Sequence, residues 1–123
     1  MSNLSMGNII IKRIYEPSAE ADGFRILVDR LWPRGMKKEN AGINEWLKAV
    51  APSDALRKWY HHDKENWQEF KHKYVLELQN NPAVADLLSL IDKHKVITLL
   101  YAARDEQQNH ALVLLDFLQV LPK

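Results

Sequence analysis

The sequence of 123 residues contains no cysteine. This absence excludes disulfide bonds, zinc–thiolate sites, iron–sulfur clusters and thiol nucleophiles, and it leaves stability to ordinary packing. The chain also lacks a Walker phosphate loop, a G-x-G-x-x-G motif and a G-x-S-x-G nucleophile elbow. These missing motifs disfavour nucleotide-dependent kinases, classical dehydrogenases and serine hydrolases, and we expect no cofactor.

An excess of charge of one sign is missing as well. The chain has 17 Lys and Arg against 16 Asp and Glu, which gives a net charge of +1. No global field therefore attracts nucleic acid or an anionic membrane, and any anion site must be local. Residues 1–8 do not resemble a signal peptide, and no apolar run approaches the ~18 residues of a membrane span. We expect a cytoplasmic protein that does not bind membranes.

The composition is that of an ordinary globular domain, with 46% hydrophobic and 27% charged residues. The length suits one core and is short for two. No linker, repeat or low-complexity stretch divides the chain. We therefore predict a flexible amino-terminal segment over residues 1–8 and a single domain over residues 9–121.

Three segments have the composition of β-strands. Ile9–Tyr15 is rich in β-branched residues and is closed by Glu16-Pro17. Phe24–Val28 follows the turn signal Asp22-Gly23. Val96–Ala102 is an almost continuous apolar run, which is typical of a strand buried on both faces. We expect this third strand to be central.

The middle of the chain has the apolar spacing i, i+3, i+4, i+7 of a helical face. The first such window predicts a helix over Ile43–Val50. The next predicts a short helix after Ala51-Pro52-Ser53 whose inward residues are Leu56, Trp59 and Tyr60. We expect the apolar faces of these helices to pack inward.

Two longer helices follow. The first is expected to start at the N-cap Asp63, to end at Asn80-Asn81-Pro82, and to bury Trp67, Phe70, Tyr74 and Leu78. The second starts after Pro82 and is expected to bury Val84, Leu87, Leu88 and Ile91.

A last helix completes the pattern. Asp105, with Gln108 three residues later, has the form of a capping box, so this helix is expected to begin just after Arg104. The order strand, helices, strand, helix predicts an α/β fold: a small single-domain sandwich whose mostly parallel central sheet is covered by helices.

Polar side chains follow the ends of the predicted strands. They are Asp29, Arg30, Arg34, Tyr101, Arg104 and Asp105, with Arg13 near the end of the first strand. Open parallel sheets bind ligands at this edge. Arg30, Arg34 and Arg104 beside the N-terminus of the last helix suggest a phosphate or carboxylate ligand in a common concave site. In the alternative interpretation, Asp29 forms a structural ion pair and Asp105 only caps a helix.

His110, preceded by Asn109 at the start of the last helix, is the best candidate for a general base. We expect it to face the strand-end site with a hydrogen-bond partner, either Asp29 or Tyr101. The alternative is a structural histidine packed beside the sheet.

Two further clusters are unusual. His61 and His62 are adjacent, so on a helix they point about 100° apart and would not chelate one ion. With no spaced motif such as H-E-x-x-H, we expect no metal site, although one of these histidines could reach the strand-end site. Trp32 lies in the loop after the second strand. Three roles fit this position: lining a ligand pocket, stacking on a nucleic-acid base, or packing against apolar side chains.

Several segments together resemble a known family. They are residues 12–15, 22–35, 51–59 and 99–111, of which V-D-R-L-W-P-R-G at 28–35 is the most specific. With them the chain closely resembles the YeaO-like branch of the domain-of-unknown-function 488 family, from about Lys12 to Leu118. The resemblance implies a small bacterial cytoplasmic α/β protein and leaves its reaction open.

The chain departs from other branches of that family, which have L-L-C-A-E after a strand and a later C-H-R. Tyr101 stands at the position of the first cysteine and Asn109 at that of the second, while His110 matches the histidine. A thiol mechanism is therefore impossible here. Some members are labelled as transcriptional regulators, but this sequence has no helix-turn-helix with a basic recognition helix.

Two functional hypotheses follow. The first is a cofactor-independent hydrolase or transferase acting on a phosphorylated or other anionic small molecule or nucleotide. Its anion and ligand binders would be Arg13, Arg30, Trp32, Arg34, Arg104, Asp105 and Asn109, and its catalytic candidates His110, Asp29 and Tyr101. The alternative is a non-catalytic nucleotide or nucleic-acid binding module. Few exposed aromatics and no basic stripe favour a small ligand over a polymer. The sequence leaves a structural, partner-binding role and the oligomeric state open.

Overall fold

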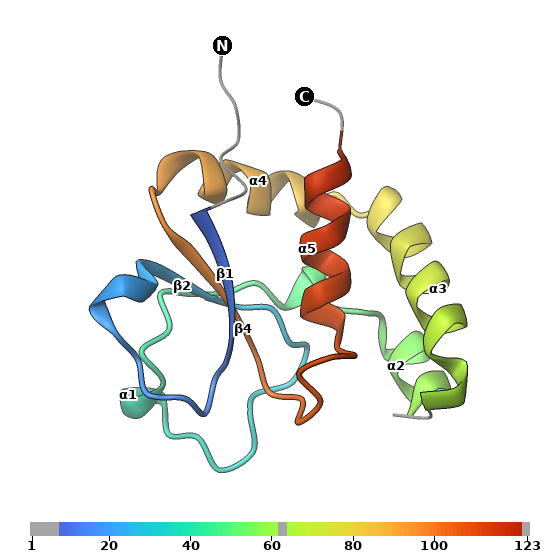
Figure 1. The fold of residues 1–123 in the computed structure, drawn as a ribbon, viewed down its shortest axis with the longest axis horizontal. Coiled ribbons are helices and arrows are strands. Elements are labelled where there is room, and N and C mark those ends of the chain that lie inside the picture. The colour runs from blue at the N-terminus through green and yellow to red at the C-terminus, as the bar shows by residue number, and fades with distance from the viewer. Residues whose placement is uncertain (1–7, 62–63, 122–123) are drawn as a thin grey trace.

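The computed structural model describes residues 8–61 and 64–121 and shows an α/β fold (Figure 1). Its centre is a four-stranded, all-parallel sheet in the order β1-β4-β2-β3. The strands are β1 Ile9–Arg13, β2 Phe24–Leu27, β3 Glu45–Trp46 and β4 Ile97–Tyr101. The α-helices are α1 Lys38–Ala41, α2 Asp54–Tyr60, α3 Trp67–Gln79, α4 Ala83–Lys93 and α5 His110–Val120. Short 3-10 turns are η2 Glu20–Asp22, η3 Lys48–Val50 and η4 Lys64–Asn66.

The three predicted strands are confirmed, and β4 is central. It pairs with β1 on one side and with β2 on the other, so Leu99 lies between Ile11 and Ile26. All five of its residues are buried. A strand enclosed on both faces can be apolar throughout, which explains its sequence.

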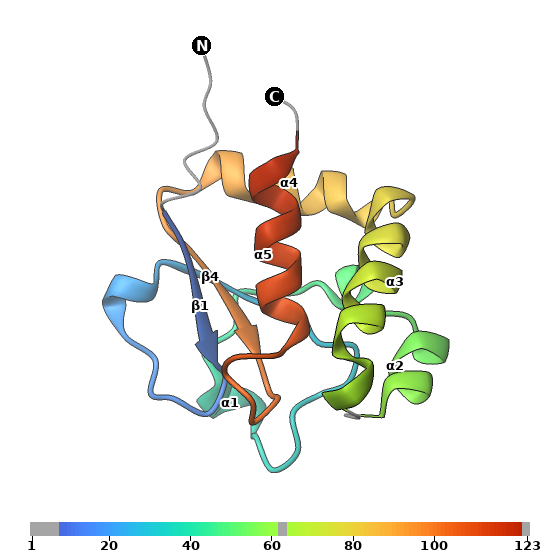
Figure 2. The ribbon, with the colours of Figure 1, turned by 45° about the vertical axis from the view of Figure 1, so that its right-hand side comes forward.

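The two faces of the sheet are covered differently. Leu99 faces a large core formed with α2, α3, α4 and α5, and these helices lie on one side of the sheet (Figures 1 and 2). Leu100, the next residue, faces a smaller cluster with Ile14, Leu27 and Ala41. That second face is covered by the short α1 and by long loops. The predicted helical cover therefore holds for one face only.

The predicted helix over residues 43–50 is wrong. Gly42 has a left-handed φ of 61°, and the chain then runs parallel to β2 as β3. Asn44 accepts a hydrogen bond from the Arg25 N–H at 2.8 Å and donates its own N–H to the Arg25 carbonyl at 2.9 Å. Leu47 N–H then donates to the Leu27 carbonyl at 2.9 Å. Pairing with a sheet edge outweighs the helical spacing of the apolar residues.

Helices α2, α3 and α4 lie where the sequence predicts them, although Leu88 of α4, expected to be buried, is only partly buried. The predicted inward face of α3 is buried, with Trp67, Phe70, Tyr74 and Leu78. In α2, Leu56 and Tyr60 are buried, but Trp59 is 40% exposed, so its inward assignment was wrong. The predicted N-cap Asp63 lies outside the described residues. Within the described residues, none of the helices is long and apolar enough to cross a membrane.

Candidate functional site

The carboxyl edge of the sheet is where the chain segments after three strands meet. Ala102 N–H donates to Asp29 Oδ2 at 3.0 Å, which joins the segment after β4 to that after β2. Trp46 Nε1 donates to the Asp29 carbonyl at 2.7 Å, which adds β3. Figure 2 shows β1 and β4 ending beside the segment that leads into α5. Asp29 is therefore the centre of this edge.

His110, the first residue of α5, points at the same place. Its Nε2 lies 3.1 Å from the Val28 carbonyl oxygen and 2.9 Å from Asp29 Oδ1. Both neighbours are acceptors, so Nε2 is a ring nitrogen that carries a proton. Asp29 lies beside the ring, as expected, but the hydrogen-bond partner of His110 is the Val28 carbonyl, not Asp29 or Tyr101.

The hydrogen bond of this pair is incomplete. The ring N–H is aligned with the Val28 carbonyl, and Asp29 Oδ1 is buried without an aligned donor among the described residues. The side chains of His110 and Asp29 are only 14% and 15% exposed. The arrangement fits an oriented imidazole, as in acid–base catalysis, and equally a structural histidine that holds α5 on the sheet.

Two of the four predicted anion-binding arginines are anchored on backbone carbonyls. Arg13 donates from Nε to Ala103 at 2.8 Å and from Nη2 to Ala102 at 3.2 Å. Arg30 donates in the same way to Pro52 at 3.0 Å and Ala51 at 3.1 Å. The guanidinium group of each arginine is thus held in place by two hydrogen bonds, and its Nη1 has no hydrogen-bond partner among the described residues.

Arg34 and Arg104 are exposed and form no side-chain hydrogen bond or ion pair with the described residues. The loop of Arg34 is held at the edge because its carbonyl accepts from the Tyr15 hydroxyl at 2.8 Å. The expected position of Arg104 at the start of the last helix is wrong, since α5 begins six residues later at His110. Arg104 instead lies in the loop between β4 and α5.

The predicted capping box is also wrong. Asn109 is the N-cap of α5, and its Oδ1 accepts from the Leu112 N–H at 3.0 Å. Asp105 Oδ1 accepts from the N–H groups of Gln107 and Gln108 at 2.8 and 3.0 Å, which forms a turn ahead of the helix. Both residues were expected at a ligand, and both have a local structural partner. The Leu112 N–H, one of the free donors of a helix start, is therefore already occupied.

Tyr101 and Trp32 are held by packing. Tyr101 ends β4 and is 3% exposed, and desolvation followed by the nearby charge of Glu106 raises the pKa of its hydroxyl. It stays protonated at neutral pH. Trp32 Nε1 donates to the Met36 carbonyl at 2.6 Å, and its ring meets Trp46 edge-on at 5.4 Å. Trp32 belongs to the smaller apolar cluster, which fits the packing interpretation.

His61 forms no side-chain hydrogen bond or ion pair with the described residues of this edge. His61 is exposed at the carboxyl end of α2, with a positive φ of 42°. His62 lies outside the described residues. Across residues 8–61 and 64–121, no three or more His, Asp or Glu side chains gather in a metal-binding arrangement.

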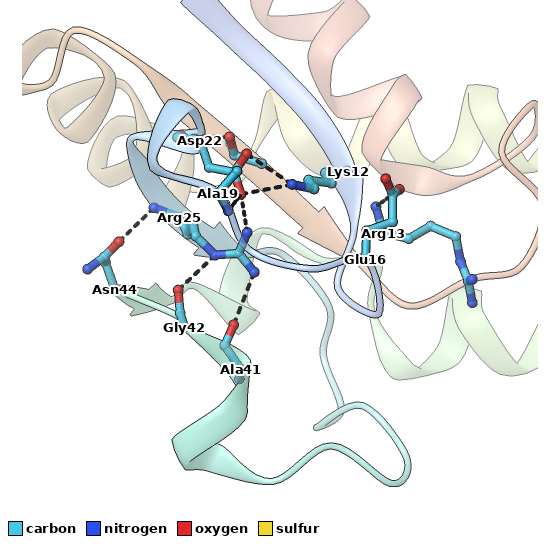
Figure 3. Close-up of polar contacts among 10 residues, drawn as sticks. Lys12, Arg13, Glu16, Ala19, Asp22, Arg25, Ala41, Gly42 and Asn44 are labelled. Carbon is cyan, nitrogen blue, oxygen red and sulfur yellow. Dashed lines mark hydrogen bonds and ion pairs between the residues drawn. The ribbon is translucent and has the colours of Figure 1, made fainter.

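Sequence reasoning missed a buried charge cluster on the second face of the sheet (Figure 3). Asp22 and Arg25 are each 5% exposed and form an ion pair, and Lys12 Nζ lies 3.0 Å from Asp22 Oδ2. Arg25 also donates to the Gly42 carbonyl at 2.8 Å and the Ala41 carbonyl at 3.0 Å. Arg13 points away from this cluster in Figure 3. The signal was present in the sequence, since Lys12 and Arg25 are charged residues inside strands.

The charge cluster alters the titration of Asp22. Burial raises its pKa, but hydrogen bonds from the Ala19 N–H, Lys12 and Arg25 outweigh burial, so the net pKa lies below the usual value. The charged side chains of the cluster all have hydrogen-bond partners, either within the cluster or on the backbone of Ala19, Ala41 and Gly42. Its contacts therefore fasten the loops over the second face.

Comparison with known proteins agrees with the sequence motifs. Residues 8–121 match the family model described as the inactive DUF488-N3 subclade. The uncharacterized protein YeaO of Escherichia coli is 46% identical over 114 residues, covering 93% of this chain and 99% of that protein. The uncharacterized protein Rv3073c of Mycobacterium tuberculosis is 42% identical over 108 residues, covering 88% and 91%. No solved structure matches.

The chain belongs to the DUF488 family. Membership in this family was predicted from the motifs around Asp29 and His110, and it is confirmed. The structure shows what Asn109 does at the position where the other branches it resembles have the cysteine of C-H-R. Asparagine is a good N-cap residue, and here its Oδ1 accepts a hydrogen bond from the Leu112 N–H. In this DUF488 protein the position serves the helix.

Proposed function

We propose that the protein is a non-catalytic binding module for a small anionic ligand, such as a phosphorylated metabolite or a nucleotide. The observation that carries this proposal is a set of arginines at the carboxyl edge of the sheet whose guanidinium N–H groups are not fully engaged by described residues: Arg13, Arg30, Arg34 and Arg104. Charge-assisted hydrogen bonds from arginine are strong and suit oxyanions.

Anchoring makes two of these arginines suited to binding. The backbone carbonyls already fix the forks of Arg13 and Arg30, so a ligand that meets their Nη1 groups orders little further side-chain freedom. Exposed Arg34 and Arg104 add positive charge on the segments that follow β2 and β4. Because such ligands are intracellular metabolites, the proposal includes a cytoplasmic location.

Three features support binding without turnover. The family model is described as inactive, and the chain has no cysteine for a thiol mechanism. His110 directs Nε2 at two protein oxygens, which favours a structural role for that nitrogen. Tyr101 is kept protonated by burial, so it does not serve as a base at neutral pH.

Calorimetric titration with pyrophosphate and with a nucleoside triphosphate tests the proposal. We expect binding that weakens with salt, and a loss of about tenfold in affinity for Arg34→Ala and for Arg104→Ala. Arg57→Ala is the matched control, because Arg57 is an arginine on α2 that pairs with Asp54. No binding by the wild type, or an equal loss in the control, contradicts the proposal.

The second candidate is a cofactor-independent hydrolase or transferase, favoured by the carboxylate of Asp29 at 2.9 Å from His110 Nε2. A carboxylate on one ring nitrogen orients the other as a base. Incubation of the protein with the ligands that bind, followed by chromatography of products, separates the two. Turnover that His110→Ala abolishes would replace the binding module by the enzyme.

Nucleic acid is the less favoured ligand. The rings of Trp32 and Trp46 pack on each other and hold their N–H groups on backbone carbonyls. Base stacking by single-stranded nucleic acid needs exposed ring faces along a basic groove. In the same titration, we expect a short single-stranded oligonucleotide to bind no more tightly than a mononucleotide.

A further inference from the structure

Tyr15 is an exposed aromatic residue at the carboxyl edge of the sheet, and it has no part in the function proposed above. It follows the end of β1 and is 40% exposed. The backbone forms a turn here, in which the Glu16 N–H donates to the Arg13 carbonyl at 3.1 Å. The Tyr15 hydroxyl donates to the Arg34 carbonyl at 2.8 Å. The ring is therefore held at both ends, so a ligand that binds on it orders little further side-chain freedom.

The Tyr15 ring is connected to the arginines of the proposed anion site. The Arg13 guanidinium lies over the ring, with its Cζ 5.1 Å from the ring centroid. The same guanidinium is anchored on the carbonyl of Ala103, the residue before Arg104. The hydroxyl of the ring is held by the backbone of Arg34. An aromatic surface and cationic groups therefore occupy the same part of the edge.

Tyr15 is also available to a second ring. Among the described residues, Arg13 is the only cation over the Tyr15 ring, and no other aromatic ring contacts it. Trp32 and Trp46 differ from Tyr15, because their rings pack on each other. Nucleobases stack on exposed aromatic side chains whatever their sequence, because every base has a flat π-face. The exposed part of the Tyr15 ring therefore suits a planar, uncharged group.

The charges of the turn separate the place of a base from that of a phosphate. Glu16 Oε2 accepts from the Arg13 N–H at 3.2 Å, so a carboxylate lies beside the turn that carries Tyr15. The Arg13 guanidinium extends away from that carboxylate (Figure 3). A phosphate beside Glu16 would meet a like charge, whereas a neutral base would not. The arrangement directs phosphates to the guanidinium of Arg13 and leaves the ring of Tyr15 to the base.

We propose that Tyr15 is the stacking platform for the base of a nucleotide whose phosphates bind the arginines. The platform rests on the anion site proposed above, and it selects nucleoside phosphates over phosphorylated metabolites without an aromatic group. The base stacks on the Tyr15 ring, and the phosphates meet Nη1 of Arg13 and the exposed side chains of Arg34 and Arg104. A single ring serves a single base, so the ligand is a mononucleotide and not a single-stranded polymer.

Calorimetric titration with adenosine triphosphate and with inorganic triphosphate separates the base from the phosphates. We expect the wild type to bind the nucleotide about tenfold more tightly than inorganic triphosphate. Tyr15→Leu should remove this preference and leave the affinity for inorganic triphosphate within about twofold of the wild type. Tyr15→Phe should retain the preference, because it keeps the ring. Trp59→Leu is the matched control, since Trp59 on α2 is also 40% exposed and has Lys73 Nζ over its ring at 4.7 Å.

The outcomes distinguish the platform from the anion site. A wild type that binds neither ligand overturns both. Equal affinities of the wild type for the two ligands overturn the platform alone and leave the anion site standing. A Tyr15→Leu variant that binds both ligands equally weakly also overturns the platform if each affinity falls by the same factor, because the side chain then only holds the loop of Arg34. Loss of the preference in Tyr15→Phe or in Trp59→Leu overturns it too, because stacking on the Tyr15 ring is then not its cause.

Discussion

At His110, one ring nitrogen meets two protein oxygens, and the stability of the fold and the chemistry of the site depend on the same contact. The Val28 carbonyl holds the ring N–H, and Asp29 Oδ1 lies beside it without an aligned donor. A buried oxygen that loses its donor costs free energy, whereas a catalytic base that is removed costs only rate. The two roles therefore differ in a measurable way.

We predict that His110→Ala lowers the free energy of unfolding by about 1–3 kcal/mol, because the buried Val28 carbonyl and Asp29 carboxylate lose the imidazole. Urea unfolding measures the change. His72→Ala is the control, since His72 is exposed on α3, and it should leave stability within about 0.5 kcal/mol of the wild type. An unchanged stability in His110→Ala would show that the ring does not hold α5 on the sheet.

A second prediction at the residue scale concerns the pH dependence of stability that Asp22 causes. Its folded pKa lies below the value of an unfolded aspartate, about 3.9. Between these two pKa values the unfolded chain binds more protons than the folded one, so stability rises with pH. The contribution of Asp22 is complete above the unfolded pKa and is lost as pH falls through the folded pKa.

Asp22→Asn should remove that dependence. We expect a loss of about 3 kcal/mol at neutral pH, because the buried charges of Arg25 and Lys12 lose their carboxylate. We also expect a flatter stability curve below about pH 4 than in the wild type. Unfolding titrations from neutral to acid pH give both quantities, with Glu20→Gln as the exposed control. Parallel curves for variant and wild type would contradict the assignment.

At the scale of elements, the amino end of α5 depends on one side chain. Asn109 is 4% exposed, caps Leu112 N–H and donates to the Asp105 carbonyl at 2.9 Å. We predict that Asn109→Ala destabilises the protein by about 1–2 kcal/mol. Asn109→Ser, which retains a capping oxygen, should lose less. Thermal unfolding measures both, with exposed Asn40 replaced by Ala as a control. An alanine variant as stable as the wild type would refute this cap.

The predictable elements are those whose signals are local or depend on burial alone. The apolar run of β4 and the face of α3 follow directly from burial, so the sequence was sufficient for them. The segment of β3 has a helical spacing, and only its hydrogen bonds to Arg25 and Leu27 make it a strand. Likewise, Asp105 and Asn109 are both good capping residues, and the path of the loop decides which one caps. Such long-range choices are not encoded in a local pattern.

The same limit applies to the candidate site. The proximity of His110 to Asp29 was predictable, because both follow signals for the carboxyl edge of a parallel sheet, whereas the hydrogen bond of the ring to the Val28 carbonyl was not. The carbonyl partners of Arg13 and Arg30 were not, because no residue type marks a backbone acceptor. Whether these arginines bind a ligand stays a prediction that titration must test.

At the scale of the whole molecule, the sheet has two unequal covers. Leu99 and Leu100 are adjacent in β4 and both have no exposed surface. Leu99 packs in the large core against helices, whereas Leu100 packs in the small cluster beneath loops. A cavity costs less free energy where the surrounding structure can relax into it. Because loops relax more readily than packed helices, a cavity beneath the loops should cost less.

Replacement of each leucine by alanine should reveal this asymmetry. We predict that both variants lose about 2–5 kcal/mol, with Leu99→Ala the more destabilised. We further predict that Leu100→Ala accelerates amide hydrogen exchange in the loops over residues 16–23 and 31–44, while α3 and α5 keep their protection. Urea unfolding and hydrogen exchange measure the two effects. Equal losses with exchange spread evenly over both faces would show that the loop layer is as firmly packed as the helices.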